Sequence, residues 1–171
     1  ASHSDSPVFK VKTDPEIEVD KAYIQLNVEK YGGMICSPWL DRPLSVAGRV
    51  LLRTSKGVET RLLNIDRDLL VIPNLAIHMN REVNDGYKFN AQKDMLPLFS
   101  TEEGKGGFRK IVAEALSVKE ECILDWDLFL YNRQKATFLG AEEEFIGSGR
   151  LDDLQCAFAS LQGILSAKPK D

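Results

Sequence analysis

The residue types that could carry out chemistry are few, because the sequence has only 2 histidines. His3 and Asp5 stand two positions apart, and on an extended segment this spacing places the imidazole and the carboxylate on the same face. In that geometry Asp5 can hold the ring nitrogen that does not bind metal, which fixes the tautomer of a ligand histidine. The alternative interpretation of the same tripeptide is a polar, frayed chain end.

The other chemically suggestive residues have ordinary explanations as well. His78 lies beside Ile77 and Met79 on a segment expected to be a short helix or turn over 74–80, where histidines commonly serve packing or lie at the surface. Adjacent carboxylates such as Glu142–Glu144 can split their pKa values, as an acid/base pair in a carbohydrate-processing enzyme requires. Such a run is more commonly a solvated loop.

Composition and charge exclude several classes of protein. The net charge is −4 and the basic residues are scattered singly among acids, so the sequence predicts no nucleic-acid partner and no anionic membrane surface. No apolar run approaches the roughly 20 residues that cross a bilayer. The 3 cysteines are an odd number without a CxxC motif, which favours neither a disulfide framework nor a zinc finger and fits a reducing cytoplasm.

Hydrophobic patterning gives an outline of the elements that must position these residues. Periodicity predicts strands over 8–12, 23–28, 46–53, 59–65, 69–72 and 123–131, and helices over 108–116 and from Asp152 or Asp153 onward. Thr13-Asp14-Pro15 is expected to break the chain, Thr54–Gly57 to form a hairpin turn, and residues 84–107 to be mainly loop. The sequence therefore predicts an α+β fold.

Four blocks, in order along the chain, carry a resemblance to one family. His3-Ser4-Asp5-Ser6-Pro7 resembles the His-x-Asp-Ser-Pro signature of the aspartyl aminopeptidase family, di-zinc exopeptidases that include the vacuolar-type aminopeptidases. The second block is Tyr31–Gly33 with Trp39–Arg42 and Leu44–Val50, the third is Ile72–His78, and the fourth is Glu144–Ile146 with Gly149–Leu154. Together they extend over nearly the whole chain, which makes the resemblance far more specific than any one block.

The resemblance implies a metal site. His3 would be a ligand to one zinc ion, Asp5 its orienting carboxylate, and Asp152 the aspartate that bridges both metals. Two zinc ions held by such a bridge activate a shared water for attack on the peptide carbonyl. Asp153 stands where family members usually carry Asn, and its role is left open.

The resemblance also implies a domain organisation. Residues 1–12 would be the N-terminal piece of an α/β catalytic domain, 13–145 a mostly antiparallel β dimerisation (lid) domain, and 146–171 a helix of the catalytic domain. His78 would reach across to the active site of a neighbouring subunit and contact substrate. Cys36, Asp41 and Arg42 lie in a matching block, but no chemistry is assigned to them.

The implied function is that of a cytoplasmic aminopeptidase that removes N-terminal residues, preferably Asp or Glu, and assembles as dimers stacked into larger shells such as dodecamers. Family members place a Glu-Glu pair, an Asp and a His after the bridging aspartate. The residues after Asp152 do not offer these groups, and Glu143-Glu144 precedes the bridging position. The chain is therefore expected to be a fragment that is inactive alone.

A rival interpretation assigns no chemistry to the chain. In this alternative it is a non-catalytic, β-rich self-association module, and the hairpin strand Val46–Arg53 is expected to offer its edge to a partner strand.

Overall fold

The structure, a computed structural model, describes residues 1–168. The chain forms two compact units. The sheet unit is Val8–Arg133, and the terminal unit joins Ala1–Pro7 to the residues from Gln134 onward. Assignment of these parts to a dimerisation domain and a catalytic domain stays a prediction, and residues 169–171 of the expected last segment lie outside the described residues.

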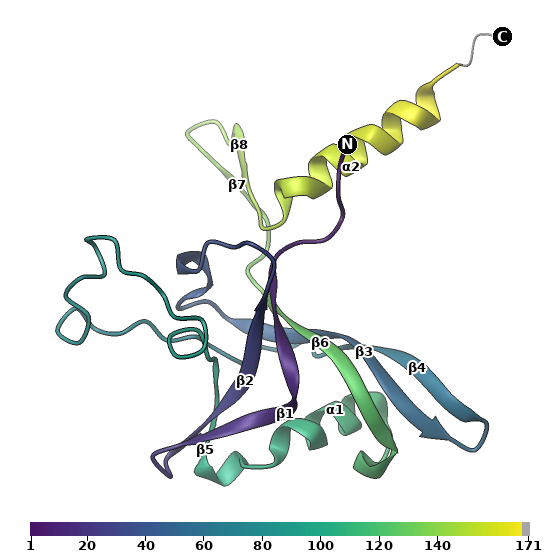
Figure 1. Ribbon diagram of the computed structural model, residues 1–171. Coiled ribbons are helices and arrows are strands. Elements are labelled where there is room, and N and C mark those ends of the chain that lie inside the picture. The colour runs from purple at the N-terminus through teal and green to yellow at the C-terminus, as the bar shows by residue number, and fades with distance from the viewer. Residues whose placement is uncertain (169–171) are drawn as a thin grey trace. The chain divides into compact units, whose positions relative to one another are not determined.

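The sheet unit is built on six strands: β1 (Val8–Val19), β2 (Tyr23–Tyr31), β3 (Leu44–Thr54), β4 (Gly57–Asn64), β5 (Leu98–Thr101) and β6 (Ile123–Asn132). Their order in the sheet is β4-β3-β6-β1-β2-β5, and every neighbouring pair is antiparallel (Figure 1). Single helical turns occur at Ser37–Trp39, Glu102–Gly104 and Glu120–Cys122. A mostly antiparallel sheet with two α-helices confirms the predicted α+β fold.

Two expectations about strands were wrong. Thr13-Asp14-Pro15 does not break the chain: β1 runs through it, and the register with β2 shifts between Val11 and Glu16 instead. Such an irregularity accommodates Pro15, which has no N–H to donate to a ladder. The segment Val46–Arg53 is not an edge either, because β3 lies between β4 and β6.

A short segment after β4 bridges two strands that are not neighbours in the sheet. Leu70 bridges to Leu44 at the start of β3, and Val71 bridges to Leu98 at the start of β5. The expected strand 69–72 therefore exists only as isolated bridges, which link the start of β3 to the start of β5. β5 itself lies in the stretch expected to be loop, since its four residues are too few to show an alternating pattern.

Helix α1 (Gly107–Leu116) packs on the sheet through Phe108, Val112 and Ala113, which are buried. A carboxylate on β1 fixes where the helix begins. Glu16 accepts hydrogen bonds from the backbone N–H of Gly106 at 2.6 Å and of Phe108 at 2.8 Å. The first N–H groups of a helix have no partner within it, and a carboxylate there also suits the helix dipole.

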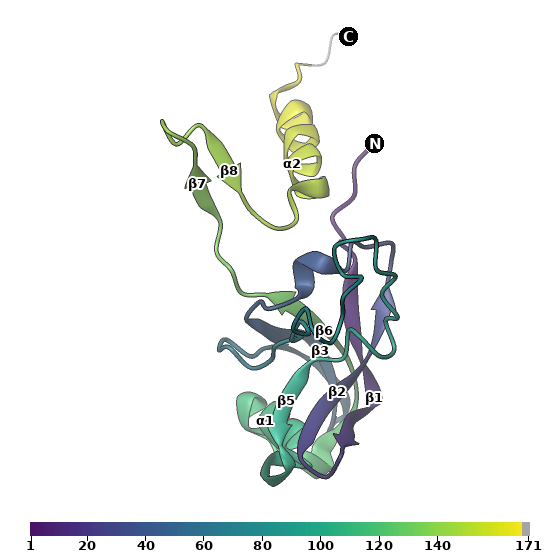
Figure 2. The same ribbon diagram turned by 90° about the vertical axis from the view of Figure 1, so that its left-hand side faces the viewer.

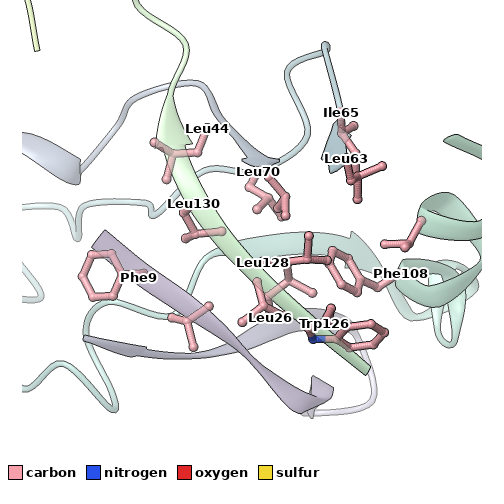
Figure 3. Packing of buried hydrophobic residues seen from close by; sticks show 14 of the residues in the cluster. Phe9, Leu26, Leu44, Leu63, Ile65, Leu70, Phe108, Trp126, Leu128 and Leu130 are labelled. Carbon is pink, nitrogen blue, oxygen red and sulfur yellow. The ribbon is translucent and has the colours of Figure 1, made fainter. Parts of the chain in front are cut away.

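Among the described residues the hydrophobic core lies within the sheet unit, and Figure 3 shows part of its packing. Alternate residues of β6, namely Trp126, Leu128 and Leu130, point into it, as the pattern of that strand predicts. The rings of Phe108 and Trp126 meet edge to face with their centroids 5.8 Å apart, which joins α1 to the sheet.

The terminal unit contains a two-stranded hairpin, β7 (Thr137–Leu139) with β8 (Phe145–Gly147), and helix α2 (Leu151–Ser166) (Figure 2). The periodic segment predicted to be the last helix is confirmed as α2. No described residue of this unit is buried, and its apolar side chains are exposed, Phe158 at 64%. Among the described residues neither α-helix has the length and apolarity to cross a bilayer.

Candidate metal centre

The backbone at the start of α2 is irregular where two carboxylates stand. Asp152 has φ −88° and ψ 107°, Asp153 has φ −124° and ψ 25°, and the peptide bond between them is cis. Both residues precede the regular turns of the helix. The structure therefore holds two adjacent carboxylates at the head of α2, on non-helical backbone.

Three side chains of the terminal unit that could bind a metal lie together. His3, Asp152 and Asp153 each offer one potential ligand atom, and these atoms lie within 4.8 Å of one another. His3 Nε2 is 3.4 Å from Asp152 Oδ1, and the His3 backbone N–H donates to Asp153 Oδ2 at 3.1 Å. The first residues of the chain thus run beside the head of α2, although 150 positions separate His3 from Asp153.

The other ring nitrogen of His3 faces Asp5. Nδ1 lies 2.9 Å from the Asp5 backbone carbonyl oxygen and 3.4 Å from its carboxylate Oδ1. The hydrogen bond to that carbonyl raises the pKa of His3, and the carboxylates of Asp153, Asp5 and Asp152 raise it further. In the tautomer that donates from Nδ1, the lone pair of Nε2 is on the side of Asp152. Asp5 is placed where an orienting group belongs, with its main-chain oxygen nearer than its carboxylate.

Asp153 links the head of α2 to the first residues of the chain. Hydrogen bonds from the Cys156 thiol and from the His3 backbone N–H lower the pKa of Asp153, and the Cys156 backbone N–H contributes as well. The same carboxylate raises the pKa of the Cys156 thiol. The sequence alone assigns no role to Asp153 or to Cys156. Asp153 stands three positions before Cys156, a spacing at which a carboxylate can accept a hydrogen bond from a backbone N–H of the first helical turn, and this spacing is the sequence signal that could have linked the two residues.

This arrangement offers one imidazole nitrogen and the oxygens of two carboxylates, a donor set that suits Zn²⁺. The side chains are accessible, since His3 is 52% and Asp152 is 95% exposed. A zinc site ordinarily has four ligands. The described residues that gather here supply three candidate groups, so the donor chemistry fits zinc while the cluster is short of a full set.

His78 lies in the sheet unit, exposed to solvent, on a turn in which the N–H groups of Met79 and Asn80 donate to the Ala76 carbonyl. The expected short helix or turn is a turn. Asp41 Oδ1 accepts a hydrogen bond from the Asn74 backbone N–H at 2.8 Å. Asp41 therefore anchors the segment that carries His78.

The remaining candidates lie outside the cluster of His3, Asp152 and Asp153. The Cys36 thiol is free and packs against the core, and Arg42 is exposed. Glu142–Glu144 form the exposed connection between β7 and β8, where Glu144 Oε2 accepts from the Glu142 backbone N–H at 3.0 Å.

Comparisons with known proteins identify the family of this chain. Residues 1–171 match the family described as aminopeptidase I zinc metalloprotease (M18). A probable M18 family aminopeptidase 2 of Clostridium acetobutylicum is 49% identical over 172 residues, which is 97% of this chain and 40% of the relative. The chain thus spans about 40% of the length of the curated relatives it matches.

Solved structures have the same fold. Ape4, in its complex with Nbr1, is 33% identical with a TM-score of 0.86, covering 95% of this chain and 35% of that one. The S. cerevisiae mApe1 dodecamer is 25% identical with a TM-score of 0.76, covering 96% of this chain and 37% of that one. The chain belongs to the M18 family of zinc metallo-aminopeptidases.

Proposed function

We propose that this chain is part of a di-zinc aminopeptidase, in which His3 binds one zinc ion and Asp152 bridges two. The observation that carries the proposal is the approach of His3 Nε2 to Asp152 Oδ1, at 3.4 Å, with Asp153 in the same cluster. Residues remote in sequence have no local reason to meet in this way. The membership in a zinc metalloprotease family names the metal.

Each carboxylate near His3 has a distinct proposed role. Asp5 holds the Nδ1 proton of His3, so that Nε2 is the atom offered to the metal. Asp152 has two carboxylate oxygens, which allows it to serve two ions, and Asp153 ties the head of α2 to the first residues of the chain. Zinc bound in such a site lowers the pKa of water and polarises the peptide carbonyl.

The substrate proposed is a peptide with an N-terminal Asp or Glu. This preference follows from the resemblance to the aspartyl aminopeptidase family. His78 is proposed to contact the substrate of a neighbouring subunit, and its exposure on an anchored turn is compatible with that role. His78→Ala, in a longer form of the protein that contains this chain, is expected to lower kcat/KM at least about tenfold without changing zinc content.

We further propose that the protein self-associates through dimers that build a larger shell. The support is the fold shared with a solved aminopeptidase that is a dodecamer. The odd and scattered cysteines favour a reducing compartment, and cytoplasmic residence stays a prediction.

The second candidate function is a non-catalytic self-association module. The large, well-packed sheet unit favours it, because that unit holds the whole core and none of the three clustered metal-binding candidates. Under this alternative His3→Ala and Asp152→Ala leave every measurable property unchanged.

The test is a peptidase assay with Zn²⁺ or Co²⁺ present. The 171-residue chain alone is expected to show no turnover, because its cluster lacks a general base and a full ligand set. A longer form is expected to release N-terminal Asp and Glu, and His3→Ala is expected to abolish that activity. Turnover of an aspartyl substrate by the chain alone would contradict the ligand assignment. A longer form that prefers an apolar N-terminal residue would contradict the proposed specificity.

A further inference from the structure

The two edges of the sheet are protected to different degrees. β5 is an edge of only four residues, its register with β2 is irregular, and the segment around Val71 bridges to it. β4 is an edge of eight residues paired with β3 in unbroken register. Among the described residues no strand pairs with its outer side (Figure 1).

β4 has few of the devices that usually keep an edge strand from pairing, and its two charged residues, Glu59 and Arg61, form an ion pair with each other. Its sequence, Gly57–Asn64, contains no proline and no lysine, and its pairing with β3 has no bulge. It also presents large apolar side chains to solvent, with Leu62 84% and Val58 69% exposed. An exposed edge strand with regular backbone and large apolar side chains is a template for another strand.

The hairpin turn determines which backbone groups of β4 are available. Ser55 and Lys56 form the turn, so Thr54 and Gly57 are its closing pair and exchange hydrogen bonds. Antiparallel pairs alternate between hydrogen-bonded and non-hydrogen-bonded. The N–H and C=O groups of Val58, Thr60 and Leu62 therefore point away from β3, towards the free side.

The sequence of this edge is complementary to itself. About a two-fold axis at Thr60, an antiparallel second copy places Thr60 opposite Thr60, Val58 opposite Leu62, and Glu59 opposite Arg61. The hydrogen-bonded pairs in this register are those of residues 58, 60 and 62, which are the residues whose backbone groups are free. Glu59 and Arg61 then form the non-hydrogen-bonded pairs, in which facing side chains are closest.

The charges support this register. Glu59 and Arg61 already form an ion pair within one chain, 2.7 Å between Arg61 Nε and Glu59 Oε1, so both side chains lie on one face. Pairing two copies would set four charges of alternating sign side by side on that face. On the other face, the exposed Val58 and Leu62 of each copy would cover those of the second.

We propose that the β4 edge joins two copies of this chain by antiparallel pairing about a two-fold axis at Thr60. A closed, isologous contact of this kind matches the commonest symmetry of homo-oligomers. The proposal rests on the self-association proposed above and identifies the surface that provides it. The proposed surface contains none of the clustered residues His3, Asp152 and Asp153.

The test reverses one charge at a time. In the proposed register residue 59 of each copy faces residue 61 of the other, so Glu59→Lys or Arg61→Glu gives both of these pairs like charges. Each variant alone is therefore expected to dimerise at least about tenfold more weakly. An equimolar mixture of the two variants restores two opposite-charge pairs and is expected to recover the dimer. Sedimentation equilibrium over a concentration series measures all three samples beside the unaltered chain.

Two matched controls change charge elsewhere on the surface of the sheet unit. Glu103→Lys repeats the charge change of Glu59→Lys, and Lys88→Glu repeats that of Arg61→Glu. Both are expected to dimerise like the unaltered chain. Unfolding curves of all variants verify that the fold is retained, since each altered side chain is at least partly exposed.

Each other outcome contradicts a defined part of the proposal. An unaltered chain that is monomeric over the whole series overturns self-association itself. A dimer that the two charge reversals do not weaken overturns the β4 edge and leaves self-association intact. Weakened variants that the mixture does not restore overturn the register about Thr60.

Discussion

Gly48 is a residue at which two strands approach too closely for a side chain. A Cβ atom on Gly48 would lie 2.0 Å from the backbone carbonyl oxygen of Asp127 on β6. Since backbone atoms cannot move aside cheaply, Gly48→Ala is expected to lower the free energy of unfolding by about 3 kcal/mol, measured by urea denaturation. Gly33→Ala is the matched control, because nothing lies within 4 Å of its added Cβ. Equal stability of the two variants would contradict this account of the β3–β6 contact.

Asp127 carries a charge that links three neighbouring strands. Its carboxylate pairs with Lys10 Nζ of β1 at 2.8 Å and with Arg49 Nη2 of β3 at 2.7 Å. These hydrogen bonds hold the pKa of Asp127 below its ordinary value of 3.8. A carboxylate with a lowered folded pKa stabilises the fold above its unfolded pKa and loses that contribution as the pH falls through the folded pKa.

Asp127→Asn is therefore expected to cost about 1 kcal/mol near neutral pH, and progressively less as the pH falls below about 4. Urea denaturation of both proteins over a pH series measures the difference. In an Arg49→Gln background the cost of the same change is expected to shrink. A difference between the proteins that grows on acidification would contradict the role of these ion pairs.

The spacing of residues predicted the contact between His3 and Asp5, and it could not predict the approach of His3 to Asp152 and Asp153. The i, i+2 spacing of His3 and Asp5 suggested that one holds the ring of the other, and the structure brings His3 Nδ1 to Asp5. Spacing carries no information about an approach across 150 positions, and only the resemblance to a family joined His3 to Asp152. The position of the Asp153 side chain depends on non-helical backbone angles, which no periodic pattern of residues encodes.

Among the elements, the start of α1 depends on a carboxylate from another strand. Glu16→Ala removes both acceptors for the Gly106 and Phe108 N–H groups. This variant is expected to lower the free energy of unfolding by about 1–2 kcal/mol, measured by urea denaturation. Glu16→Gln keeps one acceptor and is expected to lose about half as much. Glu18→Ala, which removes only the ion pair with Lys105, is expected to cost less than about 1 kcal/mol. Equal losses for Glu16→Ala and Glu18→Ala would show that the helix start does not depend on Glu16.

Elements with a long periodic pattern were predicted correctly, and short or interrupted ones were not. Helix α1 and strand β6 bury one face each, so their sequences alternate with the expected periods. β5 has four residues directly after Pro97, and β7 and β8 have three each, which is too little sequence to show a period. The first strand was predicted to end at Lys12, before Thr13-Asp14-Pro15, because the effect of a bulge cannot be read from residue types alone.

Considered as a whole, the molecule concentrates its core in one unit. All described hydrophobic residues that are buried lie between Phe9 and Leu130, inside the sheet unit. A truncated chain of residues 8–133 is therefore expected to unfold cooperatively, with a midpoint within about 5 °C of the full chain. Differential scanning calorimetry measures both. A truncated chain without a cooperative transition would show that the sheet unit depends on the rest of the molecule.

His3 and Asp152 are proposed to bind the same metal. Because the sequence has only 2 histidines, imidazole ¹⁵N NMR reports each one separately while Zn²⁺ is added. The His3 Nε2 resonance is expected to move on addition of Zn²⁺, and the resonances of His78 are expected to stay. In the Asp152→Asn variant the same movement is expected to require at least about tenfold more Zn²⁺. The exposed control Glu143→Gln is expected to behave like the unaltered chain. A His3 response that is the same with and without the Asp152 carboxylate would contradict the claim.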